Sequence, residues 1–426
     1  MKRPANLQPD GIIDTRHIGV LDGVRALAIL LVVWFHFWQQ NWLMPIFDTP
    51  FLAPLGIWRI DLDFIPRASY LFVDLLLLLS AFCLFLPYAR AALQDEPLPG
   101  ARAFYKKRLV RILPCYYLCV LPVFFLYSLP HSGYWTAGAA WKDLFATLTF
   151  TQTFWVDTYI GTHINVVLWT AAIEMQFYLL FPLLARAFAK RPVWTYLGMV
   201  AVSELYLRCF ALPDPDGLRM TLNQLVAFFG VFANGMAGAY LFVALARRFK
   251  RSMALSACGT AAFVLSVALI GLVLRGAASA AHVQSYQAAW RFPLSLLFLL
   301  LVISLPLSFR WLRAVFSNRV ARYLAAISYN LYIWHQWLLV RLKEWHIPYW
   351  EGELPPNMTG DRVWQWQYTL LALALSMALA TLITYCFERP LSRRLLRTPG
   401  GRDDGAPAQP GREPLAQKTE ENTHAL

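Results

Sequence analysis

The chain has 426 residues, of which 58% are hydrophobic and 15% charged, and its formal net charge is +13. A soluble protein of this length needs more polar residues to cover its surface, so the composition excludes an ordinary soluble enzyme. Apolar runs of about 20 residues recur along the chain, which indicates a polytopic membrane protein. Membrane orientation explains the positive charge better than nucleic-acid binding does.

We predict an all-α, polytopic transmembrane bundle in the cell membrane, that is, the inner or plasma membrane. If the N-terminus is cytoplasmic, the inner segments hold 27 of the 38 Lys and Arg residues and the outer segments hold 10. This asymmetry predicts that both termini are cytoplasmic. The predicted organisation is a cytoplasmic segment at 1–16, a transmembrane domain at 17–395 and a disordered cytoplasmic tail at 396–426. The ten predicted spans are about 20–39, 68–88, 113–129, 167–189, 192–212, 222–246, 254–274, 290–308, 323–342 and 367–387.

The first span carries ionisable side chains within an apolar helix. Arg25 and His36 are eleven residues apart, which places them on one helix face about 16 Å apart along the axis. Asp22 lies one turn before Arg25 and can neutralise it. Charges in a membrane are costly and mark candidate functional sites. The alternatives are an interfacial ion pair at Asp22 and Arg25 and a packing role for His36.

Three later spans carry polar residues at a similar predicted depth. Asp74 lies in the second span and Glu174 in the fourth, while Ser328, Tyr332 and His335 form one stripe on the ninth. With His36, four ionisable groups from four helices are expected in the outer half of the membrane. This convergence predicts a site built from two histidines and two carboxylates.

The densest basic cluster follows the second span, in the segment Phe104–Leu113. It contains Lys106, Lys107, Arg108 and Arg111, and their charges alone favour a topology signal that also touches anionic lipid. Arg108 and Arg111 are three residues apart and point the same way, so they can also grip a phosphate group.

Together these motifs resemble the membrane acyltransferase family 3, over about residues 17–395. The first match is Leu21-Asp22-Gly23 with Arg25 and His36, followed by the pair Arg108 and Arg111. The later matches are Trp169, Glu174, Phe177 and Tyr178, and then Ser328, Tyr329, Tyr332 and His335. The second span departs from the family pattern, since Leu76 and Leu77 replace two Phe and Ala81 replaces Gly. The chain resembles the stand-alone form, without a fused esterase-like domain.

The resemblance implies transfer of an acyl group, most often acetyl, from cytoplasmic acyl-CoA to a hydroxyl of a glycan or similar acceptor at the outer face. The predicted catalytic residues are His36, as base or transient acyl carrier, with Glu174 and Arg25. Arg108 and Arg111 are expected to bind the donor, and Asp74, Ser328, Tyr332 and His335 to give polar support. Acyl-CoA is the expected donor substrate, with neither a metal nor a permanently bound cofactor.

The tryptophans suggest where the acceptor binds. The predicted topology places 15 of the 17 on the outer side, more than an aromatic belt at both interfaces would give. Indole rings pack well against sugars, so we predict an outward-open cavity above His36 with Trp38 and Trp337 as its nearest walls. Two other classes fit the sequence: a proton-coupled transporter, and a non-catalytic, flippase-like assembly partner.

Overall fold

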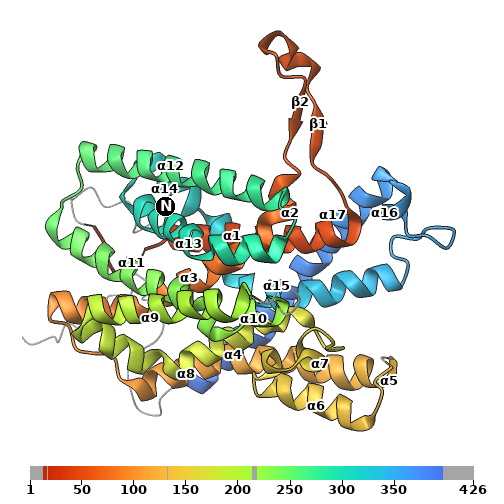
Figure 1. The fold of residues 1–426 in the computed structure, drawn as a ribbon, viewed down its shortest axis with the longest axis horizontal. Helices are drawn as coiled ribbons and strands as arrows, with labels where there is room; N and C mark the ends of the chain where they lie inside the picture. The colour runs from red at the N-terminus through yellow and green to blue at the C-terminus, as the bar shows by residue number, and fades with distance from the viewer. Residues whose placement is uncertain (1–12, 17, 132, 214–217, 397–426) are drawn as a thin grey trace, which may run out of the picture.

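The computed structural model describes residues 13–16, 18–131, 133–213 and 218–396 and consists almost entirely of helices (Figure 1). The predicted segment 1–16 and tail 396–426 therefore lie largely outside the described residues. The helices, in chain order, are α1 (Val20–Asn41), α2 (Phe64–Ala68), α3 (Phe72–Gln94), α4 (Ala101–Pro122), α5 (Leu129–His131), α6 (Ala137–Leu148), α7 (Val156–Tyr159), α8 (Trp169–Lys190), α9 (Pro192–Tyr206), α10 (Leu218–Leu222), α11 (Phe229–Arg248), α12 (Met253–Ala278), α13 (Val283–Leu307), α14 (Arg310–Phe316), α15 (Arg319–Glu344), α16 (Pro356–Thr359), α17 (Arg362–Leu382) and α18 (Arg389–Leu396).

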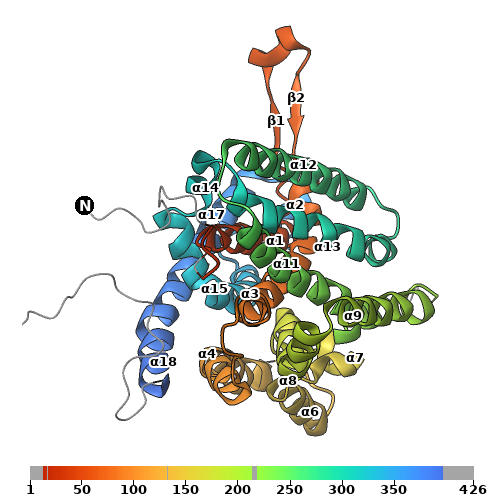
Figure 2. The ribbon, with the colours of Figure 1, turned by 90° about the vertical axis from the view of Figure 1, so that its left-hand side faces the viewer.

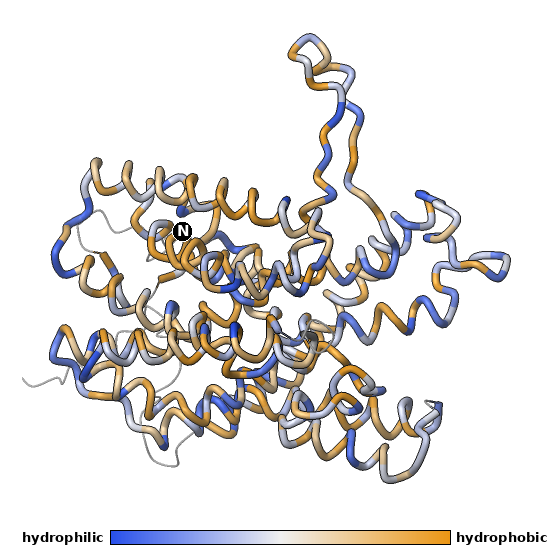
Figure 3. Tube along the Cα trace, viewed as in Figure 1, coloured by the Kyte–Doolittle hydropathy of each residue, from blue (hydrophilic) through white to orange (hydrophobic). Residues whose placement is uncertain are grey.

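Within the described residues, eight helices are long and apolar enough to cross a membrane. They confirm an all-α, polytopic bundle. Apolar residues run along the helices and polar residues gather at their ends (Figure 3). The eight are Val20–Asn41, Phe64–Gln94, Ala101–His131, Val166–Lys190, Leu225–Arg248, Met253–Ala278, Val283–Leu307 and Arg362–Leu396.

The two remaining predicted spans, 192–212 and 323–342, are also helical but fall outside this set. The first forms α9 and a π-helical continuation, Leu207–Ala211. The second forms α15, which buries Asn330 and His335 at 0% exposure. Polar side chains with partners inside the bundle lower the apolarity of α15, although the helix still packs along α1 and α17.

Helix starts are set by polar residues that precede apolar runs. Ser252, Asn318 and Asp361 each accept a hydrogen bond from a backbone N–H in the first turn of α12, α15 and α17. Such caps satisfy donors that a helix start leaves unpaired. They fix where these three helices begin.

The helix α3 is the centre of the bundle, because 78% of its apolar stretch is buried, whereas only 33% of α12 is buried. It packs along α11, where Gly235 allows the backbones to touch; a Cβ there would collide with the Leu78 carbonyl. Gly23 has the same effect on α1, where a Cβ would collide with the backbone of Phe316. The glycine after Leu21-Asp22 therefore lets α1 lie directly against α14.

A short antiparallel hairpin, β1 (Ile46–Asp48) and β2 (Arg59–Asp61), follows α1. Its register pairs Ile46 with Asp61, Phe47 with Ile60 and Asp48 with Arg59. The hairpin stands away from the helices in both views (Figures 1 and 2). Alternation over three residues is too short a signal to predict such a strand from sequence.

A buried ion pair joins α3 to α13. The carboxylate of Asp74 lies 3.4 Å from the Nε of Arg291, and both side chains are 1% exposed. Arg291 also donates a hydrogen bond to the Leu222 carbonyl at 2.6 Å and lies over the Phe228 ring. Removing one partner of a buried pair leaves an uncompensated charge, which costs much more than the pair itself contributes.

We therefore expect Asp74→Asn to lower the free energy of unfolding by about 3–5 kcal/mol. Thermal unfolding of the purified protein in detergent measures the change. The matched control is Asp157→Asn, which breaks an exposed pair with Lys142 and should change little. An Asp74→Asn protein as stable as the wild type would show that the pair is not a structural lock.

Candidate functional site

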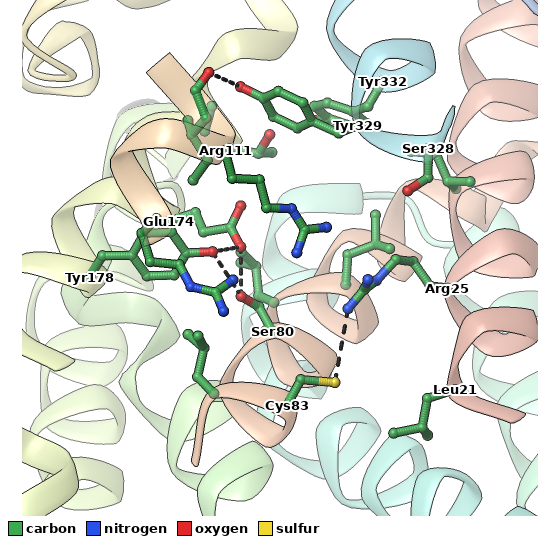
Figure 4. A pocket seen from close by; sticks show the side chains of 18 of the residues that line it. Leu21, Arg25, Ser80, Cys83, Arg111, Glu174, Tyr178, Ser328, Tyr329 and Tyr332 are labelled. Carbon is green, nitrogen blue, oxygen red and sulfur yellow. Dashed lines mark hydrogen bonds between the residues drawn. The ribbon is translucent and has the colours of Figure 1, made fainter. Parts of the chain in front are cut away.

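A polar cavity of about 370 Å³ lies inside the bundle between α1, α3, α4, α8 and α15. Arg25, Ser80, Arg111, Glu174 and Tyr178 come from four of these helices and point into it (Figure 4). It extends to the end of the bundle at which α1 and α4 begin, which we call the inner end because the predicted orientation places it in the cytoplasm. Arg16, whose side chain is 77% exposed, lies at that end.

The inner end of the cavity is held together by one carboxylate. Glu96, in the loop after α3, accepts hydrogen bonds from Arg16 at 2.8 Å and from Arg90 at 3.0 Å. Arg90 also donates to the Thr15 carbonyl at 2.9 Å. The two guanidinium groups, Arg90 first, hold the pKa of Glu96 below its usual range. These contacts tie the segment before α1 to the end of α3.

The helix α4 supplies two guanidinium groups to one wall. Arg108 and Arg111 both line the cavity, while the neighbouring Lys106 and Lys107 are exposed and lie outside its lining. Among the described residues, Arg111 has no hydrogen-bond partner, and the buried Nε of Arg108 has none. Arg108 and Arg111, three residues apart, therefore share the helix face that borders the cavity, whereas Lys106 and Lys107 point away from it. Donors that face a cavity without a partner are suited to binding an anion, as the sequence predicts for this arginine pair.

Arg25 enters the cavity from α1. Its Nη2 lies 3.9 Å from the Cys83 sulfur, a weak contact that leaves the guanidinium group free for a stronger acceptor. Asp22 also lines the cavity, but within the described residues it forms no ion pair with Arg25. The expected internal neutralisation of Arg25 by Asp22 is therefore wrong in this structure.

Glu174 lies in the cavity in contact with two hydroxyl groups. Its Oε1 accepts a hydrogen bond from Ser80 at 2.6 Å and another from Tyr178, one turn along α8 (Figure 4). The Ser80 and Tyr178 oxygens are 3.2 Å apart. The sequence predicts that Glu174 shares one site with the two histidines, and the structure corrects this, because its contacts here are hydroxyl groups. Sequence reasoning missed Ser80, whose only signal is a hydroxyl in an otherwise apolar run of α3.

The three predicted residues of α15, Ser328, Tyr332 and His335, do not all face the cavity. Ser328 and Tyr332 line the cavity together with Tyr329, which had no predicted role (Figure 4). Tyr332 donates a hydrogen bond to the Val167 carbonyl at 3.3 Å. One turn further along, His335 is completely buried and lies outside the lining.

The two histidines meet each other. The Nε2 of His335 lies 3.0 Å from the Nδ1 of His36. The Nδ1 of His335 faces the backbone carbonyls of Tyr332 at 2.7 Å and Leu331 at 3.1 Å. The predicted cluster of four ionisable groups is therefore separated into a histidine pair, a cavity carboxylate and the Asp74 ion pair. Asp74 contacts Arg291 and is not a lining residue.

The histidine pair lies outside the cavity lining, next to its residue Tyr332. The Tyr332 ring, which lines the cavity, has its centre 5.7 Å from that of His335. Ile29 lines the cavity on α1, and His36 is seven residues further along, or about 10 Å. The described residues contain no group of three or more His, Cys, Asp and Glu side chains that could hold a metal ion.

The two predicted wall tryptophans do not line this cavity, and both pack against other aromatic rings. Trp38 stacks on Phe35 and lies under the Arg67 guanidinium group. Trp337 packs edge-on against Tyr127 and Trp334, and its buried Nε1 has no hydrogen-bond partner among the described residues. The outward-open, Trp-walled cavity above His36 therefore stays a prediction.

The fold and the site together define a membrane-integral helical protein with an arginine-lined cavity and a histidine pair beyond Tyr332. A family model described as an acyltransferase domain matches residues 18–387. The chain belongs to this acyltransferase family, which confirms the predicted resemblance.

A candidate O-acetyltransferase of Staphylococcus aureus (strain COL) is similar in sequence. It is 22% identical over 373 residues, which cover 80% of this chain and 53% of that protein. The chain therefore spans about half the length of this relative. No solved structure matches the chain significantly.

The cavity geometry predicts binding of a diphosphate group. Pyrophosphate should raise the melting temperature of the purified protein, and Arg108→Gln with Arg111→Gln should weaken its binding about 10-fold or more, because charge-assisted hydrogen bonds are lost. The matched control is Lys106→Gln with Lys107→Gln, which removes the same charge outside the cavity. If both double variants lost the same affinity for pyrophosphate, the effect would come from net charge alone and would contradict a specific site.

Proposed function

We propose that the protein is an O-acyltransferase of the cell membrane that moves an acetyl group from cytoplasmic acetyl-CoA to a hydroxyl of a glycan at the outer face. The observation that carries this proposal is one cavity lined by Arg16, Arg25, Arg108 and Arg111, whose lining residue Tyr332 packs against His335 of a histidine pair outside the cavity. Membership of the acyltransferase family supports the reaction class.

The donor end fits a nucleotide with several phosphates. Arginine binds phosphate through paired N–H donors, and four arginines in one cavity match a ligand with several negative charges. A volume of about 370 Å³ is within the usual range for small-molecule sites. Arg25 and His36 are about 16 Å apart along α1, so a donor with its diphosphate near Arg25 needs a long, narrow arm to carry its thioester to His36.

Glu174 balances charge along this route. Its Oε1 is occupied by Ser80 and Tyr178, and its carboxylate faces a cavity rich in arginine. A carboxylate held in this way orients the guanidinium groups and accepts hydrogen bonds from N–H groups in the arm of the bound donor. Tyr332 stands between this part of the cavity and His335. The thioester reaches the histidines only when the Tyr332 side chain moves.

The reaction itself needs a base near the thioester carbon. The acceptor oxygen forms a bond to the acyl carbon, and the bond from that carbon to sulfur breaks. His36 takes the hydroxyl proton and returns it to the thiolate of coenzyme A, so that the products are the ester and free thiol. His36 keeps part of its surface exposed, whereas His335 does not, so His36 is the ring that the acceptor can reach.

We expect His36→Ala to lower the transfer rate about 100-fold or more, the usual contribution of a general base. Binding of coenzyme A should stay within about twofold, because the arginine cavity is intact. Acceptor acylation in membranes and donor binding in detergent measure the two effects. His131→Ala, a change at an exposed histidine, is the control. Normal product formation by His36→Ala would remove this residue from the mechanism.

The acceptor is expected to approach from the opposite end of the bundle, near Trp38 and Trp337. We expect Trp337→Ala, alone or with Trp38→Ala, to raise the acceptor KM several-fold and leave donor binding unchanged, because ring contacts with a sugar are lost. Trp194, which is 74% exposed near the inner end of the bundle, gives the control variant Trp194→Ala. Loss of coenzyme A binding in the Trp337 variant, or an unchanged acceptor KM, would contradict a carbohydrate site there.

A further inference from the structure

The hydrogen bonds of the histidine pair determine which ring nitrogens carry hydrogen. His335 directs its Nδ1 at two backbone carbonyls, of Tyr332 at 2.7 Å and of Leu331 at 3.1 Å. Carbonyl oxygens only accept, so this Nδ1 is a donor and carries the hydrogen. In a neutral ring the Nε2 of His335 then has only a lone pair and must accept.

The same reasoning extends to His36. Its Nδ1 lies 3.0 Å from the Nε2 of His335. Because that Nε2 is an acceptor, the Nδ1 of His36 must donate and carries the hydrogen of its neutral ring. The Nε2 of His36 is then left unprotonated. Among the described residues, the His36 ring contacts His335 through its Nδ1 and also faces the backbone of Val32, one turn earlier, and we take the Nε2 as the nitrogen that accepts a proton.

We propose that His335 is a positioning residue that fixes His36 in the tautomer whose Nε2 acts as the base. This inference rests on the proposed acyl transfer, in which His36 takes the acceptor proton. Backbone carbonyls of α15 orient His335, and His335 orients His36, in the same order in which a carboxylate orients the histidine of a serine protease triad. His335 itself contacts neither the donor nor the acceptor in this scheme.

The pair also accommodates the charge that forms during transfer. When the Nε2 of His36 takes the hydroxyl proton, the ring becomes an imidazolium and its Nδ1–H bond to His335 becomes charge-assisted and stronger. The proton on Nε2 then passes to the departing thiolate, which restores the neutral pair. No proton is gained or lost over the cycle.

Two amide substitutions separate this positioning from simple packing. In His335→Gln the side-chain amide reaches the place of the imidazole Nε2, so its oxygen can accept from His36. In His335→Asn the amide reaches only the place of Nδ1, so it can bond the helix carbonyls but not His36. His335→Leu removes both contacts and keeps an apolar side chain in the buried position.

We expect His335→Leu and His335→Asn to lower kcat about 10-fold or more, with the donor dissociation constant within about twofold of the wild type. His335→Gln should recover most of the rate. Equal rates for the Gln and Asn variants, or an undiminished kcat in the Leu variant, would overturn the proposal. Each variant is compared at equal abundance of folded protein.

The tautomer can also be measured without any variant at position 335. Nitrogen-15 magnetic resonance of histidine-labelled protein in liposomes distinguishes protonated from unprotonated ring nitrogens, and His36→Gln identifies the His36 signals. We expect a protonated Nδ1 and an unprotonated Nε2 on His36, and the reverse assignment would overturn the proposal. This readout needs no substrate, so a protein that does not transfer acyl groups would refute the proposed function and leave the tautomer result intact.

Discussion

Placing charged groups inside an apolar bundle is costly, and the structure depends on how these groups are stabilised. The following charged groups, all in the described part of the chain, are stabilised in different ways. Asp74 and Arg291 neutralise each other at 1% exposure. Glu174 is held by the hydroxyls of Ser80 and Tyr178. The cavity arginines differ, since Arg111 faces open space without a hydrogen-bond partner among the described residues. In an apolar environment such a group is stable only with water or an anionic ligand beside it. The cavity arginines are therefore where the proposed function places the ligand.

The polar groups inside the bundle therefore follow one another in a definite order from the inner end to the histidine pair. Arginines come first, the Glu174 group follows, and Tyr332 separates both from His36 and His335. A donor with a charged head and a thioester at the end of a long arm matches that order. In the proposed function, this separation keeps His36 away from the open cavity until the donor arm enters, which limits hydrolysis of the thioester by water.

The fold was largely predictable because its dominant signal is local. Apolar runs of about 20 residues gave the helices directly, including α15, which shows a weaker signal since its polar residues are buried. The β1–β2 hairpin was missed because three-residue strands leave no usable pattern. For the site, helix periodicity correctly separated Arg108 and Arg111 from the adjacent lysines. Predicted depth in the membrane could not show which helices face each other. Asp74 and Glu174 therefore received the wrong neighbours, and the partner of Asp74 proved to be Arg291, far along the chain.

The most direct test of the account is a structure of the protein with bound coenzyme A in lipid nanodiscs. The account predicts the diphosphate between Arg108, Arg111 and Arg25, the arm passing Glu174, a displaced Tyr332 side chain and the sulfur next to His36. A diphosphate bound anywhere else, or an arm that ends away from the histidine pair while Arg111 stays unoccupied, would contradict it.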